Sequence, residues 1–305
     1  MTLAAPFPYF GGKRRAAPIV WRALGDPSGY VEPFAGSAAV LLARPEFKGR
    51  RVETINDADG WLVNVWRALR LSPHETAAHA FGPVTEIDYH ARLAWLQERR
   101  TPDLVAWLEG DPEAHDPKAA GWWLYVVACG IGDPFGPGPW RVVDGKLTDT
   151  RKLPHLGDAG QGVMAYFERL AARLHRVRIT CGDWRRVTTP SVTRSGAGGD
   201  GARAVFLDPP YSTSGDLYAE STAGISDDVR EWCTTKADGL RVILCGYDDE
   251  HDALLSRGWT VLDGKAGGGA GYSTNSANGR RERLWLSPEC ITAHQDALDF
   301  TEATA

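Results

Sequence analysis

The chain has 305 residues, a net charge of −5, 43% hydrophobic residues and 24% charged residues. These values are typical of a soluble globular protein and leave room for one large domain or two smaller ones. No run approaches the ~20 apolar residues of a membrane span, and the N-terminus lacks the regions of a signal peptide, so we expect a cytoplasmic protein with no membrane partner. The five cysteines lie far apart and form no C-x-x-C pair, which argues against a disulfide framework and a zinc site.

Positive charge is concentrated in local clusters although the total is negative. The total alone argues weakly against a nucleic-acid partner, but a phosphate backbone responds to a local patch. Each cluster by itself is more typical of a solvated surface, whereas several on one surface would indicate nucleic-acid binding. The clusters are Lys13 to Arg15, Arg169 to Arg178, Arg185-Arg186 and Arg280 to Arg283.

Two glycine-bearing motifs open the chain. The first, Tyr9-Phe10-Gly11-Gly12-Lys13, precedes a predicted helix from Ala16 to Leu24, and its glycines would let the backbone approach a ligand closely. The segment from Tyr30 to Leu42 then predicts a strand, a small-residue turn at Gly36 and the start of an apolar helix. Such a βα unit holds ligands on the loop and the helix N-terminus. Because Gly36 is the only glycine of the turn, a G-x-G-x-x-G dinucleotide motif is absent.

A second strand is predicted from Arg51 to Ile55, and it ends at Asn56-Asp57-Ala58-Asp59. Asp57 follows Gly36 by about 20 residues, the position at which related folds hold ribose hydroxyls with an acidic side chain. The alternative is that Asn56 or Asp57 only caps the following helix, which is predicted from Trp61 to Leu71.

Residues 72–160 differ in character and predict an inserted subdomain. Helical patterns from Glu86 to Leu108 and from Ala119 to Ala128 are followed by a glycine- and proline-rich stretch. Trp140 to Thr148 then predicts a β-hairpin, because Asp144-Gly145 lies between alternating residues. A two-stranded ribbon fits the DNA major groove, and four cations lie on or just after this one. They are Arg141, Lys146, Arg151 and Lys152.

An amphipathic helix is predicted from Gly162 to Arg176, with Arg169 and Arg173 on the face opposite its apolar stripe. We expect these two arginines, like the four cations of the hairpin, to bind DNA. A short strand from Val177 to Thr180 then leads into Cys181-Gly182-Asp183. Further strands are predicted from Leu240 to Cys245, from Trp259 to Leu262 and from Glu282 to Ser287. Residues 291–305 are expected to form a disordered tail.

The central element is the strand Ala204 to Leu207, which ends at Asp208-Pro209-Pro210-Tyr211. The two prolines make the turn stiff and cannot donate backbone hydrogen bonds, so carbonyls remain to accept them. A carboxylate, free carbonyls and an aromatic ring within four residues suit an amino group on a flat ring, because the acceptors take its N–H bonds while Tyr211 stacks on the ring. An ordinary strand followed by a loop is the alternative.

These motifs and their order resemble the Dam-like (alpha-group, D12-class) N6-adenine DNA methyltransferases, especially those found in phages. The resemblance covers residues 5 to about 290. It rests on five segments, namely Tyr9 to Lys13, Val31 to Ala38, Asn56 to Asp59, Cys181 to Asp183 and Asp208 to Tyr211. Two positions depart from the family, since Tyr9 stands in place of tryptophan and Ala38 in place of the second glycine of its motif.

The resemblance implies an α/β fold, with a Rossmann-like S-adenosylmethionine-dependent methyltransferase sheet and an inserted, mainly helical target-recognition subdomain that carries a β-hairpin. The catalytic domain would comprise residues 1–71 and 161–290, and the insert residues 72–160. Asp208, Pro209, Pro210 and Tyr211 would be catalytic. S-adenosyl-L-methionine would be bound by Tyr9, Gly11, Gly12, Lys13, Glu32, Phe34, Gly36, Asp57, Asp183 and Asp208. The expected substrate is a flipped-out adenine in double-stranded DNA, and a cognate restriction endonuclease is a further candidate partner.

The residues account for this chemistry without a metal ion or a second cofactor. Asp208 and the carbonyl of Pro209 can accept the two N–H bonds of the amine and align its nitrogen with the methyl group, while Tyr211 stacks on the base. Two other functions stay open. One is methylation of another planar amine, such as guanine N2 of ribosomal RNA. The other is a decayed, non-catalytic DNA-binding homologue, an alternative that Ala38 keeps open.

Overall fold

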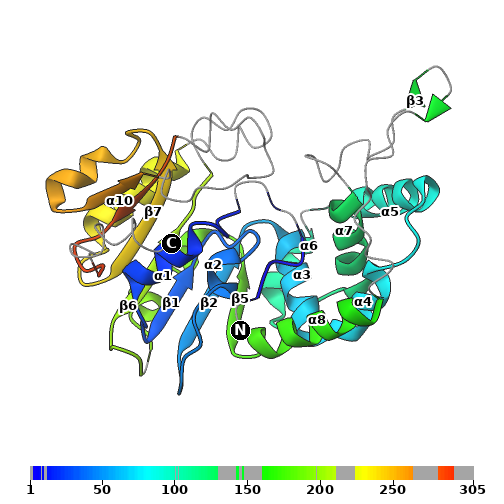
Figure 1. Ribbon diagram of the computed structural model, residues 1–305, viewed down its shortest axis with the longest axis horizontal. Coiled ribbons are helices and arrows are strands. Elements are labelled where there is room, and N and C mark those ends of the chain that lie inside the picture. The colour runs from blue at the N-terminus through cyan, green and yellow to red at the C-terminus, as the bar shows by residue number, and fades with distance from the viewer. Residues whose placement is uncertain are drawn as a thin grey trace, which may run out of the picture.

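The computed structural model describes residues 3–7, 9, 12–99, 101, 103–129, 142–143, 146–147, 160–196, 198–210, 224–263 and 281–291. Helices and strands alternate along much of the chain (Figure 1). The α-helices are α1 (Ala17–Leu24), α2 (Ala39–Leu42), α3 (Gly60–Leu71), α4 (Pro73–Ala80), α5 (Glu86–Glu98), α6 (Asp103–Gly110), α7 (Pro117–Cys129), α8 (Gly160–Leu174), α9 (Pro190–Thr193) and α10 (Ile225–Thr235). Two 3-10 helices are η2 (Trp184–Arg186) and η3 (Asp252–Arg257).

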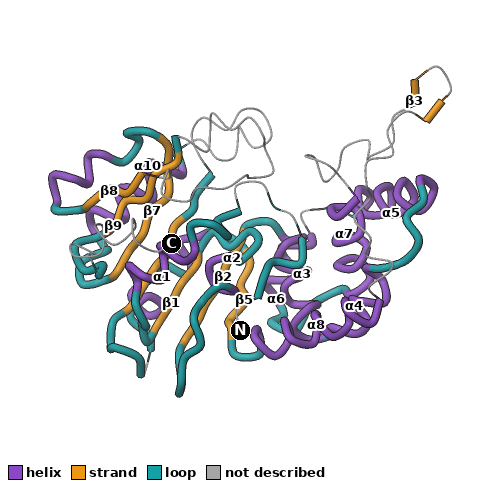
Figure 2. Tube along the Cα trace, viewed as in Figure 1, coloured by secondary structure: helices purple, strands orange, loops and turns teal. Residues whose placement is uncertain are grey.

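A seven-stranded sheet, β5-β2-β1-β6-β7-β9-β8, forms the centre of the fold (Figure 2). Its strands are β1 (Gly29–Glu32), β2 (Val52–Asp57), β5 (Val177–Cys181), β6 (Arg203–Leu207), β7 (Arg241–Tyr247), β8 (Thr260–Asp263) and β9 (Glu282–Leu286). The pairs from β5 to β7 are all parallel, whereas β9 runs antiparallel to both β7 and β8. The expected α/β class is therefore confirmed, and the sheet is compatible with a Rossmann-like fold.

The strand order reverses between β1 and β6, because β1 is followed in the chain by β2 on one side and is paired with β6 on the other. In open parallel sheets, ligands bind outside the carboxyl ends of the strands at such a switch point. The carboxyl ends of β1 and β6 carry the predicted glycine turn and Asp208. The topology therefore brings these two motifs to one edge of the sheet.

Both faces of the sheet are covered, as expected for parallel strands with continuous apolar sequences. Successive residues of a strand point to opposite faces. Phe206 accordingly joins the core with α1, α2, α3 and α8, and Leu207 joins a second core with α10 and Trp184. This double burial explains why β6 contains no polar residue after Arg203.

Helices α4–α7 share the first of these cores with α3 and α8. Tyr89 on α5 and Trp123 on α7 belong to the same buried cluster as Trp66 on α3 and Ile55 on β2. The described helices of residues 72–160 therefore extend one side of the sheet layer rather than enclosing a core of their own. The predicted helix from Glu86 to Leu108 forms two helices, α5 and α6, because Pro102 disfavours helical geometry in the residue before it.

The predicted hairpin is present as the antiparallel pair β3 (Val142–Val143) and β4 (Lys146–Leu147), in which Val143 faces Lys146. The expected turn residues, Asp144 and Gly145, lie outside the described part of the chain. Among the described helices, none combines the length and the apolar character needed to cross a membrane.

Candidate active site

The carboxyl ends of the parallel strands form the candidate site. Because β9 is antiparallel to β7, its first residue, Glu282, is paired with the last residue of β7, Tyr247, and lies at this same edge. The other residues that the parallel strands bring to the edge are Glu32 of β1, Asp57 of β2, Cys181 of β5 and Asp208 after β6.

Lys13 connects the N-terminal motif to Asp208 of the predicted catalytic motif. Its Nζ lies 2.8 Å from Asp208 Oδ1 and 2.8 Å from Glu282 Oε1. The lysine side chain is 5% exposed, against 20% for Asp208 and 30% for Glu282. Burial alone would lower the pKa of Lys13, but the two carboxylates outweigh burial and raise it well above its ordinary value. Lys13 is therefore a fixed positive charge between two carboxylates.

Asp208 has a second neighbour in Cys245, which is fully buried on β7. Burial, followed by the nearby Asp208 carboxylate, raises the pKa of the Cys245 thiol well above its ordinary value. The thiol is therefore protonated at neutral pH and can donate to the carboxylate. Lys13 and Cys245 together restrict the orientation of Asp208.

The N-terminal motif lies against the glycine turn. Gly36 has a φ of +47°, and a Cβ added there would lie 2.6 Å from the Tyr9 ring. The Gly12 N–H donates to the carbonyl of Tyr9 at 3.2 Å. Phe7, which precedes the motif, packs on Trp66 and Trp123 with ring centroids 5.5 and 5.0 Å apart. Tyr9, Gly12 and Gly36 are thus brought together as the sequence predicts, whereas Gly11 lies outside the described residues.

Asp57 holds the glycine turn from the neighbouring strand. Its Oδ2 accepts the N–H of Gly36 at 2.8 Å, and its Oδ1 accepts the N–H of Asp59 at 2.9 Å. Burial raises the pKa of Asp57 to about 6, although the two backbone bonds act in the opposite direction. The cap of α3 is Asp59, which accepts the N–H of Trp61 at 2.8 Å. Asp57 is therefore not the N-cap of α3, and the alternative that it only caps this helix does not hold.

Glu32 lies beneath the turn and is 2% exposed. Its Oε2 accepts the Tyr30 hydroxyl at 3.0 Å and the N–H of Leu41 at 3.2 Å. Burial raises the pKa of this carboxyl to about 8. Ala38, at the start of α2, is fully buried with a φ of +47°, the same left-handed conformation as Gly36. The turn therefore accommodates alanine at this position, at a conformational cost that glycine would avoid.

Aromatic and charged side chains lie near the end of β5. The rings of Phe34 and Trp184 pack with centroids 5.9 Å apart. Asp183 is the N-cap of η2. It accepts the N–H of Arg185 at 2.7 Å and pairs with the guanidinium of the same residue at 3.1 Å. The same guanidinium lies 2.5 Å from Asp228 on α10. Arg185 therefore links the predicted cofactor residue Asp183 to Asp228 on α10.

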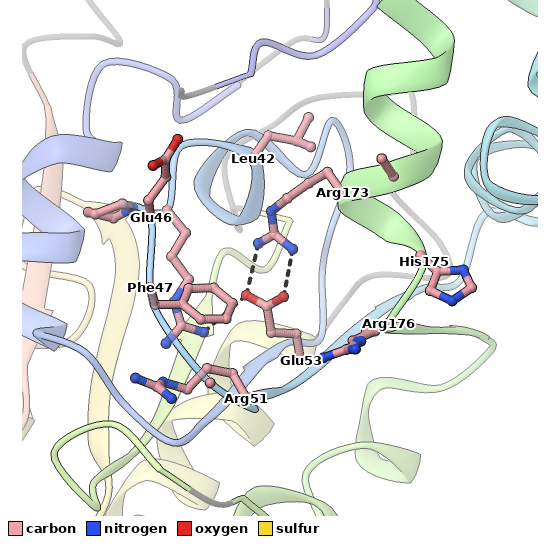
Figure 3. A pocket seen from close by; sticks show the side chains of 12 residues that line it. Leu42, Glu46, Phe47, Arg51, Glu53, Arg173, His175 and Arg176 are labelled. Carbon is pink, nitrogen blue, oxygen red and sulfur yellow. Dashed lines mark hydrogen bonds and ion pairs between the residues drawn. The ribbon is translucent and has the colours of Figure 1, made fainter.

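The predicted DNA-binding residues separate into different environments. Arg169 is exposed and lies over the Tyr166 ring at 5.1 Å. Arg173 was expected on the same exposed face, but this placement is wrong. Its guanidinium forms hydrogen bonds of 2.6 and 2.8 Å with the buried carboxylate of Glu53 and a third with the carbonyl of Leu41 (Figure 3). The side chain is 19% exposed, so Arg173 joins α8 to the sheet.

This ion pair borders a cavity of about 390 Å³ that lies near the start of β2, away from the candidate site (Figure 3). Glu53 also pairs with Arg44 at 3.0 Å, so the carboxylate is bound by two guanidinium groups. The remaining predicted DNA-binding side chains, Arg141, Lys146, Arg151 and Lys152, are not among those that the structure describes. Tyr211 also lies outside the described residues, whereas Pro209 is buried and Pro210 is half-buried.

Two residues at the site were not predicted from their local sequence. Asn56 is 1% exposed, and its Nδ2 donates to the carbonyls of Pro33 and Gly182 at 3.1 and 2.9 Å. It therefore ties the ends of β1, β2 and β5 together. The signal was a polar residue at the end of an apolar strand. Glu282 gave no comparable signal, because its place depends on the pairing of β9 with β7.

No protein-family model matches this chain, and no curated protein has a significant sequence match to it.

Proposed function

We propose that the protein is a site-specific DNA-methyltransferase that acts on the exocyclic N6 amine of a flipped-out adenine in double-stranded DNA, with S-adenosylmethionine as methyl donor. One observation carries the proposal. The ion pair between Lys13 and Asp208 joins the two motifs that most resemble those of the Dam-like enzymes, and it lies at the edge where sheets with a switch point bind ligands.

The residues at the carboxyl edge of the sheet include donors and acceptors that suit S-adenosylmethionine. The absence of a side chain at Gly36 lets the Tyr9 ring pack directly on the turn, because an added Cβ would lie 2.6 Å from that ring. Asp57 and Asp183 offer carboxylate oxygens to hydroxyl and amino groups. The buried Nε1 of Trp184 has no hydrogen-bond partner among the described residues. We expect these residues to hold the cofactor, with the backbone of the N-terminal glycine motif and the Phe34 ring, and with Glu32 acting from beneath the turn.

Asp208 is the residue that we expect to bind the target amine. Its carboxylate is held by Lys13 and Cys245, and its remaining lone pairs can accept an N–H bond. When bound, S-adenosylmethionine supplies a methyl carbon to which the amine nitrogen bonds while the carbon–sulfur electron pair stays on sulfur, and the nitrogen then releases one proton to water. Asp208 would stabilise the positive charge that grows on nitrogen, an interaction strongest in the transition state.

The conformation of Ala38 bears on the alternative of a decayed enzyme. A lost glycine would argue for decay if alanine disrupted the turn. Gly36 nevertheless keeps its bond to Asp57 at 2.8 Å, and Ala38 begins α2 with its N–H bonded to the Ala35 carbonyl. The turn that would hold the cofactor is therefore intact, which favours an active enzyme.

The decisive measurement is mass spectrometry of nucleosides from DNA and RNA incubated with the protein and S-adenosylmethionine. We expect N6-methyladenine in DNA, and a rate lower by about 10²–10³ or more in Asp208→Ala with DNA binding retained. Tyr211→Phe should be mild and Tyr211→Ala severe, since stacking contributes ~1–3 kcal/mol per base.

Asp200→Asn is a control, because Asp200 is an exposed carboxylate paired with Arg241 at the opposite edge of the sheet. Thermal unfolding shows whether each variant is folded. Methylcytosine, methylated guanine in RNA, or full activity in Asp208→Ala would contradict the proposal.

A further inference from the structure

Glu282 faces Asp208 across the ammonium group of Lys13. Both carboxylates lie 2.8 Å from Lys13 Nζ, although one follows a parallel strand and the other begins an antiparallel one. Only the reversed direction of β9 puts the first residue of that strand at the carboxyl edge of the sheet, opposite Tyr247. The topology thus adds a second carboxylate to the site.

The charges of these three residues do not cancel. Lys13 contributes one positive charge, and Asp208 and Glu282 contribute one negative charge each. If Asp208 alone faced Lys13, the pair would be neutral, and the lysine would compete with any ligand for the lone pairs of Asp208. A lysine shared with Glu282 polarises Asp208 less, and these three side chains together carry one net negative charge. The lysine among them is 5% exposed.

We propose that Glu282 is a positioning residue that draws part of the Lys13 charge away from Asp208, so that the Asp208 carboxylate keeps more of its negative charge for a cationic methyl donor and an amine. This inference rests on the proposed function. A methyl donor must approach the amine that Asp208 binds, and its sulfonium therefore lies within a few ångströms of the cluster. A negative cluster stabilises that cation and the charge that passes from sulfur to nitrogen.

The first test compares the affinities of the protein for cationic S-adenosylmethionine and for neutral S-adenosylhomocysteine by calorimetric titration. Glu282→Gln preserves the shape of the side chain and removes its charge. We expect the preference for the cation over the neutral compound to fall by about 3- to 10-fold. Glu282→Asp, which keeps the charge, should restore most of the preference, and Asp200→Asn should leave it unchanged.

The second test measures DNA methylation by the same variants. We expect kcat to fall by about 10- to 100-fold in Glu282→Gln, with KM for DNA within about 2-fold of wild type, because the charge acts mainly in the transition state. Glu282→Asp should recover part of the loss. A residue with only a structural role would lower the unfolding temperature and weaken both cofactor compounds equally.

The outcomes separate this inference from the proposed function. If the wild type binds both compounds but methylates no DNA, the proposed function fails, and the affinity ratio still decides the role of Glu282. An unchanged ratio in Glu282→Gln, or an equal loss of both affinities, overturns the inference even if the wild type is an active methyltransferase. A wild-type protein that binds neither compound overturns both.

Discussion

Asp57, at the end of β2, accepts the backbone N–H of Gly36 in the loop after β1 at a distance of 2.8 Å. The carboxylate that the sequence assigns to ribose binding therefore also holds the glycine turn. A carboxylate has about four lone-pair sites, and the bonds from Gly36 and Asp59 leave room for ribose hydroxyls. Under the proposed function, Asp57 would therefore both shape the turn and contact the cofactor.

We expect Asp57→Ala to weaken both the fold and cofactor binding. Two backbone N–H groups lose their acceptor, which should lower the free energy of unfolding by about 2–4 kcal/mol. Loss of the charged bonds to ribose should weaken S-adenosylmethionine binding by a further ~1.5–3 kcal/mol. Urea denaturation and calorimetric titration measure the two effects separately.

Asp59→Ala is the control for this substitution. It removes the cap of α3, which is worth about 0.5–2 kcal/mol, but leaves Gly36 and its acceptor in place. Cofactor affinity should therefore fall in Asp57→Ala and not in Asp59→Ala. Equal cofactor affinity in Asp57→Ala and the wild type would reduce Asp57 to a structural residue of the turn.

Glu32 predicts a distinct dependence of stability on pH. Burial raises the pKa of its carboxyl from an ordinary value of 4.5 to about 8. Between these values the folded protein keeps a proton that the unfolded chain has released. The contribution of Glu32 to stability is therefore fully present below about pH 4.5 and is lost as the pH rises through about 8.

Glu32→Gln should remove this dependence, because glutamine keeps an acceptor for Tyr30 and Leu41 but has no proton to lose. Between pH 5 and pH 9, the variant should gain roughly 2–4 kcal/mol of unfolding free energy relative to the wild type. Urea denaturation at several pH values tests this. Glu98→Gln, at an exposed position on α5, is the control. Parallel pH profiles for Glu32→Gln and the wild type would show that Glu32 is ionised in the folded protein.

The sequence located the strand ends of the site because each is a local pattern, an apolar run followed by a turn or an acidic residue. Asp57 and Asp208 could be assigned to one sheet edge because parallel strands align their carboxyl ends. Glu282 could not, since the direction and the partner of β9 depend on contacts far away in the chain. The proximity of the Cys245 thiol to Asp208 could not be predicted for the same reason.

The position of Arg173 was mispredicted for a related physical cause. The helical period correctly gave the apolar stripe of α8, to which Phe167 and Leu170 contribute. A side chain at the border of such a stripe can turn toward solvent or toward the core, and its partner decides which. Glu53, on β2, is that partner, and no sequence pattern near Arg173 predicts this ion pair.

Arg173 and Arg169, one turn apart on α8, should therefore respond differently to replacement by alanine. Arg173→Ala leaves the buried carboxylate of Glu53 with Arg44 as its remaining ion-pair partner among the described residues, so we expect a loss of about 2–4 kcal/mol in unfolding free energy. Arg169→Ala should change stability by less than about 0.5 kcal/mol. If Arg169 faces phosphate, its removal should lower DNA affinity for all sequences and reduce the salt slope by about one. Urea denaturation and fluorescence anisotropy with labelled DNA at several salt concentrations measure these effects. A reduced salt slope at unchanged stability in Arg173→Ala would return this side chain to the DNA-contacting surface.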